Sequence, residues 1–410
     1  MLSTSDILDA YRADLSNAGK PRFSERDGEW LAFGTMLQRA VGLPAADRAV
    51  YLQGAGKVFA EPTDTEGLRD ALARLARDGS CPTALCTAVT LVASEIEDAG
   101  AFALATAMLD LTRVLAGVAE FRLQGRLLAH QARILRKIGE TDLAHDLFDD
   151  VAEIGATHGD QELIARAHLG KAVLARVRGN YPEARREFLA VLELAGSSGV
   201  MRDLYVHAHH GLLVVSAIAR DFDAALRHGA AAVAGAAGEQ QRVELLQNLA
   251  SVCVDVGQFR SGLHGYLHVL AAARSQRVRL GAFGGAALAA ARLGDALMVN
   301  ALVEVAAPML SHPGPEFELA DMTREFAEAY AWLNDVERWR RYRDEALDRA
   351  TRGGFFEIVH RIEAMAPPQR TPQTPGAPKI ALARDALDVA ARLASGDSRE
   401  LLAAAVSRYL

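Results

Sequence analysis

The chain contains few cysteines and few aromatic residues for its length of 410 residues. Its three cysteines, Cys81, Cys86 and Cys253, are too few and too scattered for a disulfide framework or a zinc knuckle, so we interpret them as reduced core residues. Aromatic residues make up 6% of the chain and hydrophobic residues 50%. Because strict alternation of β-branched and polar residues is almost absent, this composition favours packed helices over a sandwich of sheets.

Long apolar runs and an excess of positive charge are also missing. No uncharged run approaches the roughly 20 residues needed to span a bilayer, and the polar, acidic N-terminal segment is unlike a signal peptide. We therefore predict a cytoplasmic protein with no membrane partner. The formal net charge of −7 argues against a nucleic-acid partner. The basic run WRRYR at 339–343 could stack on nucleic acid, but flanking acidic residues favour a salt-bridged helix face.

The motifs of common catalytic sites are missing as well. There is no Walker loop, no G-x-S-x-G, no H-E-x-x-H and no glycine-rich loop after a strand. Gly281, Gly284 and Gly285 imitate such a loop, but they fall within a helical segment, where glycine permits close packing. His264 and His268 share one helical face, yet no further ligand completes a metal site. We predict a protein that is not an enzyme and that uses no metal and no cofactor.

What the sequence does contain is a repeated pair of helices. In residues 165–195, a first helix rich in small residues ends at Gly179, and a second helix begins near Pro182. With Tyr181 as the reference residue of this repeat, equivalent residues recur at spacings of 37 to 41. The seven reference residues are Phe102, Thr141, Tyr181, Phe222, Phe259, Ala296 and Val336.

Small residues recur at fixed distances from the reference residues. Three residues after them, the first five repeats have alanine or glycine, and two residues before them, five of the seven have glycine. Nine residues before them, six of the seven have alanine, namely Ala93, Ala132, Ala172, Ala250, Ala287 and Ala327. A position that must be small in nearly every repeat is one where two helix backbones touch. The pattern therefore predicts stacked helix hairpins over residues 81–365.

The segments LGKA, GNYPEARREF, ARDFDAAL and VGQFRSGL resemble the tetratricopeptide repeat (TPR), in the form of about 40 residues seen in bacterial signalling and regulatory proteins. The resemblance implies an all-α fold, a right-handed TPR-like superhelical solenoid of helix-turn-helix repeats, about seven in number. It also implies that the first helices line a concave groove. The last two repeats depart from the pattern, because Ala296 and Val336 replace the turn aromatic.

Three segments flank the repeat array. Residues 1–80 are predicted to form a helical extension or cap of four helices, at 3–15, 25–41, 45–59 and 66–77, and a helix-turn-helix DNA reader is the alternative there. Residues 366–378 contain five prolines and are typical of a linker. Residues 379–410 are predicted to form a pair of amphipathic helices, which could cap the array, enter its groove or mediate self-association.

The resemblance also indicates which residues project into the groove, chiefly those 15, 8 and 5 positions before each reference residue. Arginines dominate these positions in the second and third repeats, and apolar residues and histidines follow. The predicted partner-binding residues are Arg126, Arg133, Arg136, Arg166, Arg176, Val173, Val177, His207, His210, Val214 and Ile218. This charge pattern predicts a partner with an acidic segment. Arginines paired with local carboxylates such as Glu140 and Asp142 are the alternative.

Together these patterns predict a non-catalytic scaffold or adaptor that binds a protein or peptide partner in the groove. The alternative hypothesis is a bacterial regulatory protein whose array changes curvature when it binds a small molecule or a signalling peptide. An enzyme built from the N-terminal helices is a third hypothesis, but the sequence shows no nucleophile–base pair there.

Overall fold

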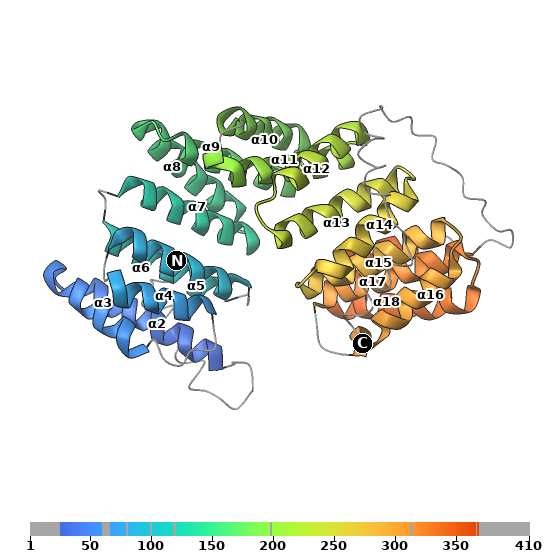
Figure 1. The fold of residues 1–410 in the computed structure, drawn as a ribbon, viewed down its shortest axis with the longest axis horizontal. Helices are drawn as coiled ribbons and strands as arrows, with labels where there is room; N and C mark the ends of the chain where they lie inside the picture. The colour runs from blue at the N-terminus through green and yellow to red at the C-terminus, as the bar shows by residue number, and fades with distance from the viewer. Residues whose placement is uncertain are drawn as a thin grey trace. The chain divides into compact units, whose positions relative to one another are not determined.

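The computed structural model describes residues 25–59, 66–78, 81–98, 101–117, 120–196, 199–311, 315–365 and 367–368. Throughout this part of the chain every regular element is a helix (Figure 1), which confirms the predicted all-helical repeat fold. The chain divides into two compact units, residues 1–195 (unit 1) and residues 196–410 (unit 2). The predicted linker, apart from its first prolines, and the predicted C-terminal helix pair lie outside the described residues.

Unit 1 is built of helices that pack in chain order. They are α2 (Glu25–Val41), α3 (Ala45–Phe59), α4 (Glu66–Asp78), α5 (Pro82–Asp98), α6 (Phe102–Ala116), α7 (Phe121–Lys137), α8 (Thr141–His158), α9 (Gln161–Val177) and α10 (Tyr181–Ala195). The first helices of successive repeats also contact one another, α5 with α7 and α7 with α9. Three of the four predicted N-terminal helices correspond to α2, α3 and α4, and the fourth, at 3–15, lies outside the described residues.

Unit 2 follows the same plan. Its helices are η1 (Gly199–Met201), α11 (Arg202–Ile218), α12 (Phe222–Gly235), α13 (Glu239–Asp255), α14 (Phe259–Ala272), α15 (Gln276–Arg292), α16 (Ala296–Ala306), η2 (Ala307–Ser311), α17 (Glu316–Trp332), α18 (Val336–Gly353) and α19 (Phe356–Glu363). First helices again contact each other, α11 with α13, α13 with α15 and α15 with α17. Among the described helices of both units, none combines the length and the apolar character needed to cross a membrane.

The turns of the structure confirm the register read from the sequence. Each of the seven reference residues is the first residue of a second helix, from Phe102 of α6 to Val336 of α18. Two residues earlier, all six turns that the structure describes have a positive φ, for example 76° at Gly179. Arg220 and Asn334 adopt this conformation at φ 60° and 61° in the two repeats that lack the glycine. The turn geometry is therefore kept even where the residue does not favour it.

The recurring alanines lie where the two helices of a pair meet. Ala132, Ala172 and Ala250 are completely buried. In the pair α13–α14, a Cβ added at Gly262 would lie 3.1 Å from the carbonyl oxygen of Ala250 and 2.5 Å from a methyl group of Val254. The space at this position is therefore bounded partly by main chain, which cannot yield as a flexible side chain does. This contact explains why the third residue after the reference residue is so often small.

Replacement of Gly262 by alanine should destabilise the protein. The added methyl group must push α14 away from the α13 main chain, and overpacking of this kind costs about 1–3 kcal/mol, against a gain of up to about 1 kcal/mol in helix propensity. Gly54→Ala in α3 is the matched control, because nothing lies within 4 Å of the added Cβ. Urea unfolding followed by circular dichroism should show a lower midpoint for Gly262→Ala and an equal or higher one for Gly54→Ala. A higher midpoint for both variants would contradict the close contact.

Candidate partner-binding site

Helices α7 and α9 carry the predicted basic residues of unit 1, and ion pairs join these two helices. Glu162 in the first turn of α9 accepts hydrogen bonds from Arg126 Nη2 at 2.8 and 2.9 Å and from Arg166 Nε at 2.9 Å. Burial acts to raise the pKa of Glu162, but these hydrogen bonds and charges outweigh it and lower the pKa. Arg126 and Arg166 thus share one carboxylate, so their charges are partly matched within the protein.

Arg133 takes part in a second cluster, which is centred on a buried carboxylate of α5. Glu97 has a side chain only 2% exposed, and its carboxylate lies 2.6 Å from Arg133 Nη2 and 2.7 Å from Lys137 Nζ. His130 Nε2 lies 3.0 Å from the same group. Burial acts to raise the pKa of Glu97, but hydrogen bonds from His130 and Lys137 and the charge of Arg133 hold it well below its usual range. We name these four residues the Glu97 cluster.

Arg136 and Arg176 differ from the other arginines of this face. Both side chains are partly buried, and neither has a hydrogen-bond or ion-pair partner among the described residues. Burial lowers the pKa of Arg136 and the neighbouring charges of Arg176 and Arg133 lower it further, whereas the charge of Glu97 acts to raise it. Each residue lies in the last turn of its helix, where the helix dipole favours a cation. The two guanidinium groups therefore form a positive site in which, among the described residues, no carboxylate is directly paired with either arginine and Glu97 acts on Arg136 only through its charge.

Apolar side chains of α9 accompany this positive site. Val173 is partly buried and Val177 is 52% exposed. Val177 is next in sequence to Arg176 at the end of α9, so an apolar surface and a cation occupy the same helical turn. Such an arrangement suits an acidic group with an apolar neighbour.

The predicted site residues of unit 2 all lie on α11. His207 Nε2 lies 3.4 Å from Asp203, and His210 Nε2 lies 2.9 Å from the amide of Asn248 on α13. Val214 is partly buried, and Ile218 is 47% exposed at the end of the helix. We describe this set separately from the arginines of unit 1, because it belongs to the other compact unit.

Two features of the polar network were not predicted from the sequence. One is the role of Glu97, although its position five residues before Phe102 is the position that Arg136 and Arg176 occupy in the next repeats. The other is a histidine pair in unit 2, in which Nδ1 of the buried His209 lies 2.8 Å from Nδ1 of the partly buried His228. In the preceding repeat the equivalent positions hold His168 and Glu187, which form an ion pair at 2.6 Å. A comparison of equivalent positions in successive repeats would have indicated both the role of Glu97 and the histidine pair, whereas a comparison of helical faces did not.

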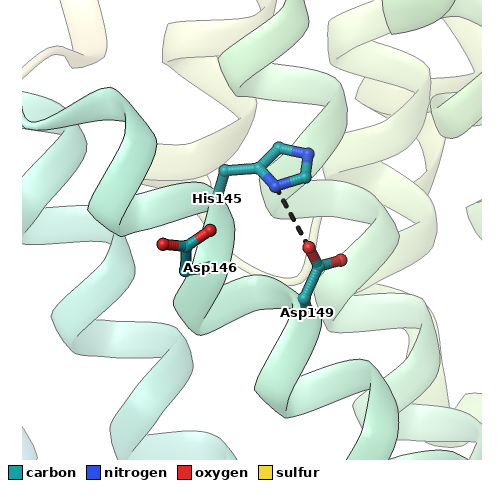
Figure 2. Close-up of side chains that lie close together, drawn as sticks. All are labelled: His145, Asp146 and Asp149. Atoms are coloured by element: carbon teal, nitrogen blue, oxygen red, sulfur yellow. Dashed lines mark ion pairs between the residues drawn. The ribbon is translucent and has the colours of Figure 1, made fainter.

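A group of potential metal ligands lies on α8 and is shown in Figure 2. His145, Asp146 and Asp149 lie close together at the surface, and His145 Nδ1 is 3.2 Å from Asp149. Asp149 also forms an ion pair with Lys171 of α9. The hydrogen bond from Lys171 is the main reason why the pKa of Asp149 is lowered. A lysine thus already supplies the positive charge here, and we assign no metal to the group.

The WRRYR segment forms part of α18, and one of its arginines has a predicted acidic partner: Arg343 lies 3.1 Å from Asp344. Arg338, just before the segment, lies 3.5 Å from Asp335. Trp339 and Tyr342 are buried rather than available for stacking on a base. This helix therefore has the salt-bridged face that the charge pattern indicates.

Comparison with known proteins shows similarity in fold only. No protein-family model and no curated protein sequence matches the chain. The chain is similar to the solved apo form of the quorum sensor NprR from B. thuringiensis, with 15% identity and a TM-score of 0.53 over 84% of this chain and 97% of that one. A circular tandem repeat protein is aligned with 17% identity over 99% of this chain and 93% of that one, but its TM-score of 0.18 supports no structural conclusion.

The histidine pair predicts a specific dependence of stability on pH. Burial and the adjacent His228 lower the pKa of His209 from 6.5 to about 4. The unfolded chain binds a proton near pH 6.5, whereas the folded protein does so only near pH 4. The free energy of unfolding should therefore be highest above pH 7 and fall by up to about 3 kcal/mol as the pH drops through this window.

Replacement of His209 by glutamine should reduce this dependence in urea unfolding between pH 7.5 and pH 4.5 and leave the share of His130, whose pKa burial also lowers. His207→Gln is the control, because it replaces an exposed histidine of the same helix and leaves the pair of His209 and His228 intact. Equal pH dependence in the wild type and in His209→Gln would show that the histidine pair is not responsible.

Proposed function

We propose that the protein is a non-catalytic TPR-type scaffold that binds an acidic segment of a protein or peptide on the face formed by α7 and α9. One observation carries the proposal: Arg136 and Arg176 occupy equivalent positions in adjacent repeats, are partly buried, and form no ion pair or hydrogen bond with a carboxylate among the described residues. A partly desolvated guanidinium gains most from a charged acceptor that arrives with the partner. Arg126, Arg133 and Arg166 border this site but already have protein carboxylates.

The repeat itself provides a model for how a carboxylate is held on this face. Glu97 is the fifth residue before its reference residue, Phe102. Cations from α7 surround its carboxylate. One repeat later the corresponding residue is Arg136, and the positions of α9 that match Arg133 and Lys137 hold Val173 and Val177. The charge at this position of the repeat is thus reversed, and the neighbouring helix offers two apolar side chains in place of the cations. A partner that brings both a carboxylate and an apolar side chain would complete this second arrangement.

A second candidate is a regulator that responds to a peptide or a small signalling molecule. The similarity in fold to the quorum sensor NprR favours it, as does the division of the chain into two compact units. Both candidates place the ligand on first helices, and they differ in whether binding changes the arrangement of the array. Small-angle scattering distinguishes them, because a regulator of this type should become more compact when it binds and a scaffold should not.

The binding site is tested by neutralising its two arginines. The probe is a fluorescein-labelled peptide in which glutamate alternates with leucine, and its affinity is measured by fluorescence anisotropy. Arg136→Gln/Arg176→Gln should weaken binding at least tenfold, because each charge-assisted hydrogen bond contributes about 1.5–3 kcal/mol. Helicity by circular dichroism should be unchanged, since neither side chain has a partner among the described residues.

Arg340→Gln/Arg341→Gln is the matched control for this experiment. It removes the same amount of charge from exposed residues of α18 in unit 2 and should leave the affinity within about twofold. Equal affinities of the wild type and of Arg136→Gln/Arg176→Gln would refute the site, as would an equal loss in both double variants.

A further inference from the structure

We propose that Glu97 is a specificity-determining residue that restricts this face to carboxylate groups and keeps it from binding polyanions such as nucleic acid. The inference rests on the proposed function, since it concerns the same face of α7 and α9. Four cations lie near one another there: Arg133, Arg136, Lys137 and Arg176. A basic strip of this kind on a helical repeat would otherwise bind a phosphate backbone without regard to sequence.

The geometry of the Glu97 cluster shows how the restriction works. The carboxylate comes from α5, the preceding first helix, and lies beneath α7 with its side chain only 2% exposed. Arg133 and Lys137 remain 48% and 37% exposed, but their charged ends turn to this buried carboxylate at 2.6 and 2.7 Å. Glu97 therefore cancels one positive charge and holds the charged groups of two side chains away from a ligand.

His130 completes the cluster without adding charge. It is buried, and this burial lowers its pKa, so the imidazole is neutral at neutral pH. The carboxylate of Glu97 thus faces two cations and one neutral ring, all from α7. The cations left for a partner are Arg136 and Arg176, one on each of two adjacent first helices. A pair of guanidinium groups suits one or two carboxylates of an acidic segment better than a continuous row of phosphates.

Replacement of Glu97 by glutamine tests this inference. The amide removes the negative charge but keeps the shape, and the exposed stems of Arg133 and Lys137 allow both cations to turn to solvent. The probe is a labelled oligodeoxythymidine of about 20 nucleotides, and its binding is measured from about 50 to 200 mM salt. Because the two released cations can each bind a phosphate group, Glu97→Gln should bind about tenfold more tightly at the lowest salt, and the slope of log affinity against log salt should steepen by about 0.7–1.4.

Two further variants make the result specific. Glu337→Gln changes the net charge equally at an exposed residue of α18 and should bind the oligonucleotide as the wild type does. In Glu97→Gln/Lys137→Gln only Arg133 is released from the cluster. This double variant should therefore show about half of the change in the salt slope that Glu97→Gln shows. This double variant also serves if Glu97→Gln proves too unstable to fold, which thermal unfolding would reveal. Wild-type salt slopes in the folded Glu97 variants, or an equal change in Glu337→Gln, would overturn the inference.

The acidic peptide is titrated in parallel, so that the two proposals can fail separately. If the wild type binds this peptide through Arg136 and Arg176 but the Glu97 variants show no increase in oligonucleotide binding, only the role of Glu97 is refuted. If the wild type does not bind the peptide but Glu97→Gln binds the oligonucleotide more tightly, the restriction on polyanions is supported and the peptide site is not.

Discussion

The close approach of two helix backbones within each repeat is the constraint on which the rest of the structure depends. At Ala250 and Gly262 the space between α13 and α14 is partly enclosed by main chain, and even a Cβ added at Gly262 does not fit there without displacement. Because the same small positions recur in successive pairs, each pair adopts nearly the same geometry. Hairpins of like geometry stack in chain order and bring their first helices into contact with one another.

This regularity is what gives a position in the repeat a functional meaning. The residue five positions before each reference residue lies at the same end of its first helix. Glu97, Arg136 and Arg176 therefore occupy the same position in α5, α7 and α9. A substitution at such a position changes the charge of the shared face while the packing beneath stays the same. In unit 1 the face therefore changes from a neutralised carboxylate to two arginines that have no partner among the described residues, and the fold does not have to alter to accommodate the change.

The fold could be predicted from the sequence because its determinants are local and repeated. Glycine two residues before the reference residue and alanine nine before it report turn and contact geometry directly, and the structure even imposes the same left-handed turn on Arg220 and Asn334. The candidate site could be predicted only in part. Helical periodicity placed the arginines on first helices, but it could not show which of them have partners, since Arg133 and Glu97 are 36 residues apart. A long side chain can reach several acceptors at that range. Among the ion pairs of these arginines, only Glu162–Arg166 has the four-residue spacing within one helix that a sequence can indicate.

The central claim is that Arg136 and Arg176 recognise an acidic segment through charge. A charge swap tests it most directly: Arg136→Glu/Arg176→Glu is titrated with the glutamate–leucine peptide and with a lysine–leucine peptide of the same length, at low and high salt. The account predicts that the wild type binds only the acidic peptide, that the reversed variant binds only the basic one, and that salt weakens both interactions. Unchanged preference for the acidic peptide in the reversed variant would contradict it.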